Sequence, residues 1–174
     1  MNIYRNNCGG CGECCCPRIC YVPCPVNPTT PAVRPYASFL VTGTAAATGT
    51  TLTFTPQINR GGALITGAAT NILTLAAGHI YQVDYMLNGT TAAAGTAQIT
   101  PLINGAAATY AQAVQATQAA PNNRFTLSGA FLIDAATAPA TFALRYDGTS
   151  AGTFAGTVIV REIDATTAST AAAY

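Results

Sequence analysis

Between Tyr36 and Ile163, apolar residues alternate with polar ones at a period of two, and this pattern limits the fold more than any other feature of the chain. Because the side chains of a strand point alternately to its two faces, each such segment predicts a strand with one buried face. The residues expected on these buried faces are Leu52, Phe54 and Ile58; Tyr81, Val83, Tyr85 and Leu87; Phe125, Leu127, Phe131 and Ile133; and Phe142, Leu144 and Tyr146.

Turn signals separate these segments. They are "RGG" at 60–62, "NG" at 88–89 and 104–105, and "DG" at 147–148. Residues 39–41 and 156–163 are apolar on both faces, which predicts central strands. About eight to ten antiparallel strands at this spacing predict an all-β sandwich or barrel.

Residues 106–120 are the segment for which strand and helix compete. Their alanine content favours a helix, and Tyr110 and Val114 have the i, i+4 spacing of a helical pair. A helix with only two large apolar residues would bury little surface, so we predict a strand here.

An arm rich in cysteine and proline precedes the body. Its cysteines are Cys8, Cys11, Cys14, Cys15, Cys16, Cys20 and Cys24, and its prolines are Pro17, Pro23, Pro25, Pro28, Pro31 and Pro35. This proline density is incompatible with a helix or a central strand and favours polyproline II or extended chain. We therefore predict three parts: a connector arm over 1–35, a β body over 36–163, and a small polar tail over 164–174.

The charge content narrows the choice of partners. Charged residues make up 7% of the chain, lysine is absent, and the net charge is +1. No basic stripe exists for a nucleic acid. No apolar run reaches the ~20 residues of a membrane span, and "MNIYRNNCGG" lacks the apolar segment of a secretory signal. A surface of Thr, Ala, Gly, Asn and Gln offers little charge repulsion, which suits a chain that associates with itself.

Three chemistries other than cross-linking could use the cysteines. The spacing C-x2-C-x2-C from Cys8 to Cys14 opens like a ferredoxin run, but Arg18 stands where the next cysteine is required. Cys8–Cys11 and Cys20–Cys24 could pair in an all-cysteine zinc site. A reduced, disordered tail is the third possibility.

Disulfides between chains are the hypothesis that we favour. Seven is an odd number, so full oxidation of the chain leaves at least one thiol for another chain. The consecutive residues Cys14, Cys15 and Cys16 point in different directions and rarely bond one another without strain. All seven cysteines are therefore candidates for inter-chain disulfides, and we predict no resident metal or cofactor.

No catalytic constellation is recognisable in the sequence. His79 is the only histidine and opens a predicted strand, which favours a surface or hydrogen-bonded role. The acids are Glu13, Asp84, Asp134, Asp147, Glu162 and Asp164. They suggest no carboxylate pair, and Asp134 and Asp147 lie where turn-forming aspartates are common. Asn88-Gly89-Thr90 matches a glycosylation triplet, but a turn also explains it. We predict that the chain is not an enzyme.

The body resembles a known family of spore-surface proteins. The likeness is carried by "ALITG", "LTLAAGHIYQVDYMLNG", "AQITPLINGAA", "FTLSGAFLID", "FALRYDGT" and "GTVIVREI", with L-x-x-G-x-x-Y at 75–81, L-N-G at 87–89 and V-x-V-x-x-I at 158–163. Over residues 36–163 the chain resembles the C-terminal domain of BclA-type exosporium glycoproteins. That resemblance implies the jelly roll of the complement-globular-head and tumour-necrosis-factor-like families, assembled as a tight trimer.

The arm departs from that family, which has a collagen-like Gly-X-Y stalk in its place. A trimerising head behind a short cysteine-rich connector is similar in layout to the subunits of bacterial endospore appendages. This likeness implies a structural subunit of a spore-surface fibre, exported without a signal peptide. Its trimers would be joined head to tail by arms and inter-chain disulfides, and the arm could also bind other spore-coat or exosporium proteins.

The alternative function is a trimeric ligand-binding module of the spore surface that adheres to protein or sugar. Recognition surfaces favour Tyr, Trp and Arg. The predicted loops here are mostly Ala, Gly and Thr, and tryptophan is absent. We therefore favour assembly over adhesion.

Overall fold

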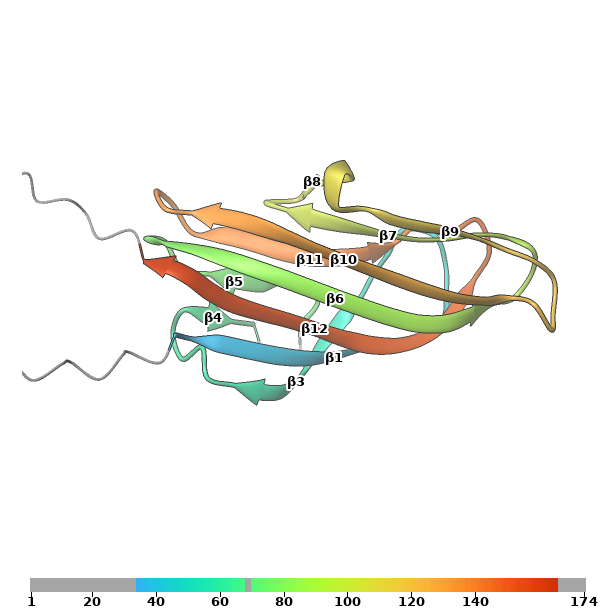
Figure 1. The fold of residues 1–174 in the computed structure, drawn as a ribbon, viewed down its shortest axis with the longest axis horizontal. Helices are drawn as coiled ribbons and strands as arrows, with labels where there is room; N and C mark the ends of the chain where they lie inside the picture. Colours follow the sequence, from blue (N-terminus) through green and yellow to red (C-terminus); the bar gives the residue numbers. More distant parts are fainter. Residues whose placement is uncertain (1–33, 68–69, 166–174) are drawn as a thin grey trace, which may run out of the picture. The chain divides into compact units, whose positions relative to one another are not determined.

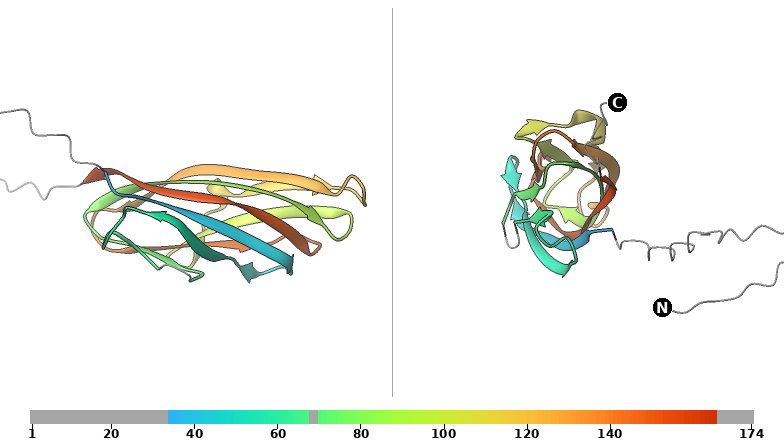
Figure 2. Two further views of the ribbon diagram at one scale, coloured as in Figure 1. Left: turned by 90° about the horizontal axis from the view of Figure 1, so that it is seen from below. Right: turned by 90° about the vertical axis from the view of Figure 1, so that its left-hand side faces the viewer.

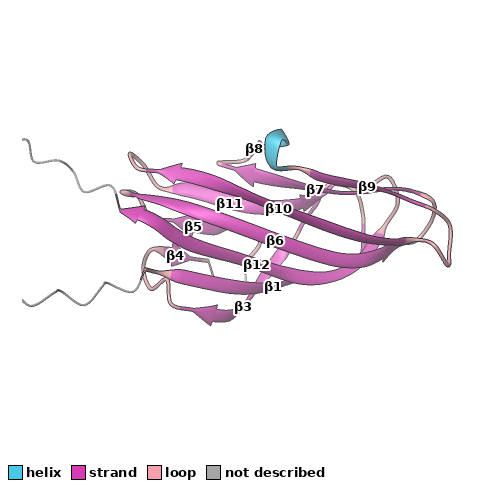
Figure 3. Cartoon of the chain, in the orientation of Figure 1, coloured by secondary structure: helices cyan, strands magenta, loops and turns pink. Residues whose placement is uncertain are grey.

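The computed structural model describes residues 34–67 and 70–165, and these form two antiparallel β-sheets around one core (Figure 1, Figure 3). The strands are β1 (Tyr36–Ala46), β2 (Thr50–Thr51), β3 (Thr53–Asn59), β4 (Ile65–Thr66), β5 (Leu73–Leu75), β6 (His79–Thr91), β7 (Gly95–Ile103), β8 (Ala106–Ala107), β9 (Ala113–Thr117), β10 (Arg124–Ala135), β11 (Ala140–Tyr146) and β12 (Gly152–Ala165). The described residues contain no α-helix, only the 3₁₀ turn η1 (Thr109–Ala111).

Sheet A has the strand order β10-β6-β12-β1-β3, and sheet B has the order β4-β5-β11-β7-β8. In sheet B, β2 also pairs with β11, and β9 pairs with β7. Viewed along the strands, the two sheets enclose the core (Figure 2). This arrangement confirms the predicted all-β jelly-roll sandwich. The described residues form twelve strands rather than eight to ten, because the two-residue strands β2, β4 and β8 carry too few residues to show a period.

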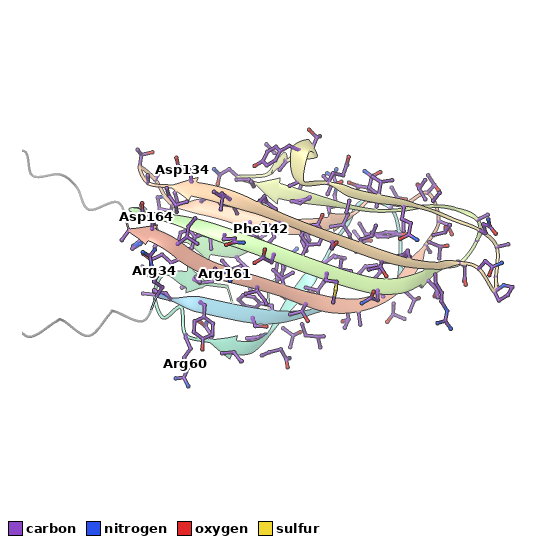
Figure 4. The ribbon with its side chains drawn as sticks, in the orientation of Figure 1. Arg34, Arg60, Asp134, Phe142, Arg161 and Asp164 are labelled. Carbon is purple, nitrogen blue, oxygen red and sulfur yellow. The ribbon has the colours of Figure 1, made fainter. Side chains whose placement is uncertain are left out.

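The predicted inward faces of β6, β10 and β11 are confirmed. Their apolar residues are at most 7% exposed. Four aromatic rings join the sheets across the core: Phe39 and Phe54 of sheet A, Phe142 of sheet B, and Phe131 of sheet A, with successive centroids 5.8, 5.6 and 5.9 Å apart. Phe142, labelled in Figure 4, thus links the two layers.

The predicted core position of Ile58 is wrong. Leu52 and Phe54 are buried, but Ile58 is 50% exposed. Val41 lies opposite Phe54 on the inner face, yet the pairing of β1 with β3 shifts between Phe39–Pro56 and Ser38–Ile58. The extra residue, a β-bulge, reverses the side to which the following residues point, so Ile58 lies beside Ser38 on the outer face.

The two "NG" pairs have different outcomes. Asn104 and Gly105 form the predicted turn, with φ values of 51° and 77°. Asn88 and Gly89 instead lie inside β6, so the predicted turn at 88–89 is wrong. A Cβ on Gly89 would lie 2.4 Å from the Thr153 carbonyl oxygen and 2.5 Å from Phe154 Cβ. Glycine is therefore required here for close strand packing rather than for a turn.

Residues 106–120 are strand only in part. They form β8, the η1 turn and β9, and β9 pairs with β7 from Ala113 to Thr117. The two segments predicted as central strands belong to β1 and β12, which both have neighbours on each side in sheet A. The structure therefore confirms their central position.

Candidate functional site

Large apolar side chains gather on the outer face of sheet A. Nine large apolar residues are exposed among the described residues, and six of them lie on this one face. We call these six the apolar face: Tyr36, Leu40, Ile58, Met86, Leu132 and Ile159. Their exposed fractions range from 37% for Leu40 to 55% for Leu132. Since a monomer gains nothing by holding such side chains in water, this clustering marks an interaction surface.

Strand pairing places the six residues side by side. Leu40 faces Thr157, and Thr157 faces Met86. At the next outward position of β1, two residues before Leu40, Ser38 faces Ile58 on one side and Ile159 on the other. The apolar face therefore crosses all five strands of sheet A, with Leu132 contributed by the edge strand β10.

One ion pair lies within this surface. Arg161 donates a hydrogen bond from its guanidinium to the Asp84 carboxylate. Gln82, which lies opposite Arg161 across the strands, donates to the same carboxylate at 3.1 Å. The charges of Arg161 and Asp84 thus neutralise each other, so a partner that contacts this part of the face meets no unpaired charge from these two residues.

The residues considered for catalysis form separate pairs. His79 Nδ1 donates to Glu162 Oε1 at 3.0 Å, at the end of sheet A where β6 begins. Asp134 accepts the backbone N–H of Ala136 at 2.8 Å, which confirms its turn-forming role. Figure 4 shows Asp134 and Asp164 near this same end, where Arg34 precedes β1. Within residues 34–67 and 70–165, no three His, Cys, Asp or Glu side chains form a group that could hold a metal ion.

Asp147 is held by a neighbouring arginine. Arg145 donates from Nε to Asp147 Oδ1 at 2.7 Å and from Nη2 to Oδ2 at 2.9 Å. Burial of the carboxyl raises the pKa of Asp147, but hydrogen bonds from Arg145 and Thr100 outweigh this effect, and the pKa is lowered overall. The arrangement is a structural ion pair with no free nucleophile or base.

The inter-chain disulfide sites predicted for the arm lie outside the described residues, because all seven cysteines do. The five arm prolines from 17 to 31 also lie outside them. Pro35 is described, and its carbonyl oxygen accepts the Glu162 N–H at 2.9 Å, next to the start of β1. No helix among the described residues has the length and apolar character needed to cross a bilayer.

The sequence indicated part of the apolar face. The mixed faces of 39–41 and 156–163 indicated Leu40 and Ile159. Met86 lies between Asp84 and Asn88 among the outward positions of its strand, and Leu132 lies between Ala130 and Asp134. A single large side chain at such a position is common on any protein surface. Their clustering depends on strand order, which the sequence pattern did not give.

Comparisons with known proteins bear on the fold. No protein-family model matches the sequence, and no curated protein matches it. Among solved structures, the chain is similar to the globular domain of zebrafish complement 1qA protein, at 9% identity and a TM-score of 0.57, over 76% of this chain and 99% of that chain. It is also similar to the Eiger TNF of S. frugiperda, at 12% identity and a TM-score of 0.53, over 76% of this chain and 94% of that chain. The jelly roll that the resemblance implied is thus shared with solved structures of the complement and tumour-necrosis-factor type.

Proposed function

We propose that the chain is a non-catalytic, self-assembling structural subunit. Its body forms a homotrimer through the apolar face, and its Cys/Pro arm joins trimers into a fibre at the spore surface. Nine large apolar residues are exposed in the part of the chain that the structure describes, and the proposal rests on six of them lying on one face of sheet A.

Burial of this face is the driving force. Apolar surface removed from water contributes about 25 cal/mol per Å², and the chain has few charges to oppose contact, at 7% of residues. The resemblance to BclA-type domains supports a trimer rather than a dimer. In a threefold ring each copy uses two different surfaces, so the apolar face of one copy would pack against a second surface of the next copy.

The arm supports the fibre. Its seven cysteines precede a body that contains none, so oxidation can join chains without affecting the core. The spore-surface location is supported by the resemblance of the body to BclA-type domains and by the layout that the arm shares with endospore appendage subunits.

Analytical ultracentrifugation of the full chain in reductant tests the trimer. Met86 and Val114 are both strand residues and both 54% exposed, but Val114 lies on β9, outside the apolar face. We expect the wild type and Val114→Arg to sediment as trimers and Met86→Arg as a monomer. A monomeric wild type, or a trimer that survives Met86→Arg, contradicts the proposed interface.

Electron microscopy of the oxidised full chain tests the fibre. We expect filaments that shorten or disperse in reductant. Dispersed trimers under oxidising conditions would contradict fibre assembly and favour the ligand-binding alternative.

A further inference from the structure

An open hollow lies beyond the apolar face, at the end of sheet A where β6 finishes and β10 begins. Its volume is about 560 Å³, within the range of small-ligand sites. Its lining residues are Asn88, Gly89, Thr90, Gln115, Arg124, Phe125 and Thr126. Three strands contribute to it, since β6 pairs with β10 and Gln115 reaches over from β9.

Hydrogen bonds fix the orientation of the two amides in the hollow. The Thr126 hydroxyl donates to Asn88 Oδ1 at 2.8 Å, and the Thr126 backbone N–H donates to Gln115 Oε1 at 2.9 Å. Both amide oxygens are therefore engaged as acceptors. The Asn88 NH₂ group and one N–H of the Gln115 NH₂ group remain to donate to a ligand, since Gln115 Nε2 makes one long bond of 3.5 Å to the Arg124 carbonyl oxygen.

The charge of the hollow comes from Arg124. Its lining contains no aspartate or glutamate, and Arg124 forms no salt bridge among the described residues. The guanidinium carries up to five N–H donors arranged to meet a carboxylate. With the two amides, it makes the hollow a site rich in donors around one positive charge.

We propose that this hollow binds an acidic saccharide, with the sugar carboxylate on Arg124 and its hydroxyls on the Asn88 and Gln115 amides and the Thr90 and Thr126 hydroxyls. An apolar ligand does not fit, because the one large apolar lining residue, Phe125, is only 3% exposed. A lone carboxylate would leave the amides and hydroxyls hydrogen-bonded only to water, whereas a ligand that also carries hydroxyl groups can bond to them directly.

The hollow is adjacent to the apolar face but is not part of it. Asn88 faces Thr126 in the strand pairing, and Met86, the nearest member of the apolar face along β6, faces Ser128. The hollow therefore uses residues none of which belongs to the apolar face.

Calorimetric titration of the full chain, kept reduced, with D-galacturonic acid tests the site. D-galactose lacks the carboxylate, and acetate lacks the sugar. We expect galacturonate to bind at least about tenfold more tightly than either, because a charge-assisted bidentate contact and several hydroxyl contacts act together. Arg124→Gln should reduce galacturonate affinity about tenfold or more.

Arg60→Gln is the matched control. Arg60 is exposed, follows β3 and donates its backbone N–H to the Tyr36 carbonyl oxygen, which places it at the opposite end of sheet A (Figure 4). The Arg60→Gln variant should bind galacturonate as tightly as the wild type does. Should Arg124→Gln fail to fold by circular dichroism, Asn88→Ala tests the amide contact instead. Absence of galacturonate binding, equal binding of galactose or acetate, or an equal loss in Arg60→Gln overturns the proposal.

Discussion

Gly129 shows how tightly single residues are fitted in this core. It lies opposite Tyr85 across β10 and β6, and a Cβ at this position would lie 2.6 Å from Tyr85 Cε1. The Tyr85 ring covers the glycine, and its hydroxyl donates to the Ala111 carbonyl oxygen at 2.8 Å. The ring therefore cannot withdraw without losing a buried hydrogen bond.

We predict that Gly129→Ala lowers the free energy of unfolding by roughly 1–3 kcal/mol, the usual cost of overpacking a core. Ser128→Ala on the exposed face of the same strand should change it by less than about 0.5 kcal/mol. Urea unfolding of both variants, followed by circular dichroism, measures the difference. Equal stability of the two variants would show that Tyr85 can move at no cost.

Buried tyrosines make the stability sensitive to alkali. Burial raises the pKa of Tyr85 from 10.0 to about 12. Burial, with a smaller contribution from the negative charge of Glu162, raises the pKa of Tyr81 to about 12. In the unfolded chain both phenols titrate near their ordinary value, so between pH 10 and pH 12 the unfolded state binds fewer protons than the folded state. The contribution of the two protonated tyrosines to the free energy of unfolding is therefore fully present below pH 10 and is lost as the pH rises toward 12.

We therefore predict that the free energy of unfolding falls steadily above pH 10, and that Tyr85→Phe makes this fall shallower. Tyr110→Phe serves as the control because Tyr110 is 75% exposed. Urea unfolding at a series of pH values gives the slopes. A slope in Tyr85→Phe equal to that of the wild type would mean that this phenol does not contribute.

At the scale of elements, the edges of sheet A are protected by side chains. On the edge strand β10, the Gln115 side chain accepts a hydrogen bond from the Thr126 N–H and donates one to the Arg124 carbonyl oxygen. It thus makes the hydrogen bonds that the backbone of a further strand would otherwise make. On the other edge, β3 contains Pro56, which has no N–H to offer a further strand. Both devices limit unwanted pairing between sheets.

We predict that Gln115→Ala accelerates hydrogen exchange of the Thr126 amide, because water replaces the 2.9 Å bond to the side chain. Gln118→Ala, at an exposed position just after β9, should leave the Thr126 amide protected as in the wild type. Exchange followed by NMR resolves this single amide. Unchanged exchange in Gln115→Ala would mean that other contacts protect the edge.

The long strands were predictable because each shows many periods. Large apolar residues occupy every inward position from Tyr81 to Leu87, and every inward position except Gly129 from Phe125 to Ile133, and these residues are buried as expected. Ile58 and the 88–89 pair were not predictable, because a bulge and a close strand crossing depend on the neighbouring strand. The hollow at Arg124 was missed for the same reason, since Gln115 reaches it from a strand that is paired elsewhere.

At the scale of the whole molecule, the proposal assigns non-covalent contacts to the body and disulfide bonds to the arm. The body associates through apolar contacts, which assemble reversibly and need no oxidant. The arm contributes covalent bonds, and a partner tied by a disulfide stays at high effective concentration after any local opening. Contacts of the body would therefore choose the partner, and the cysteines would make the assembly permanent.

This proposal predicts how the fibre responds to heat and detergent. With all seven cysteines replaced by serine, trimers should still form, because the apolar face is unchanged and the body contains no cysteine. Oxidised wild-type multimers should survive boiling in detergent and dissociate when a reductant is added, whereas those of the all-serine variant should dissociate without it. Gel electrophoresis with and without reductant measures the disulfide-linked multimers, and sedimentation of the unheated samples measures the trimers. If the all-serine multimers resist hot detergent as well as the wild type does, contacts of the body and not the disulfides hold the fibre together.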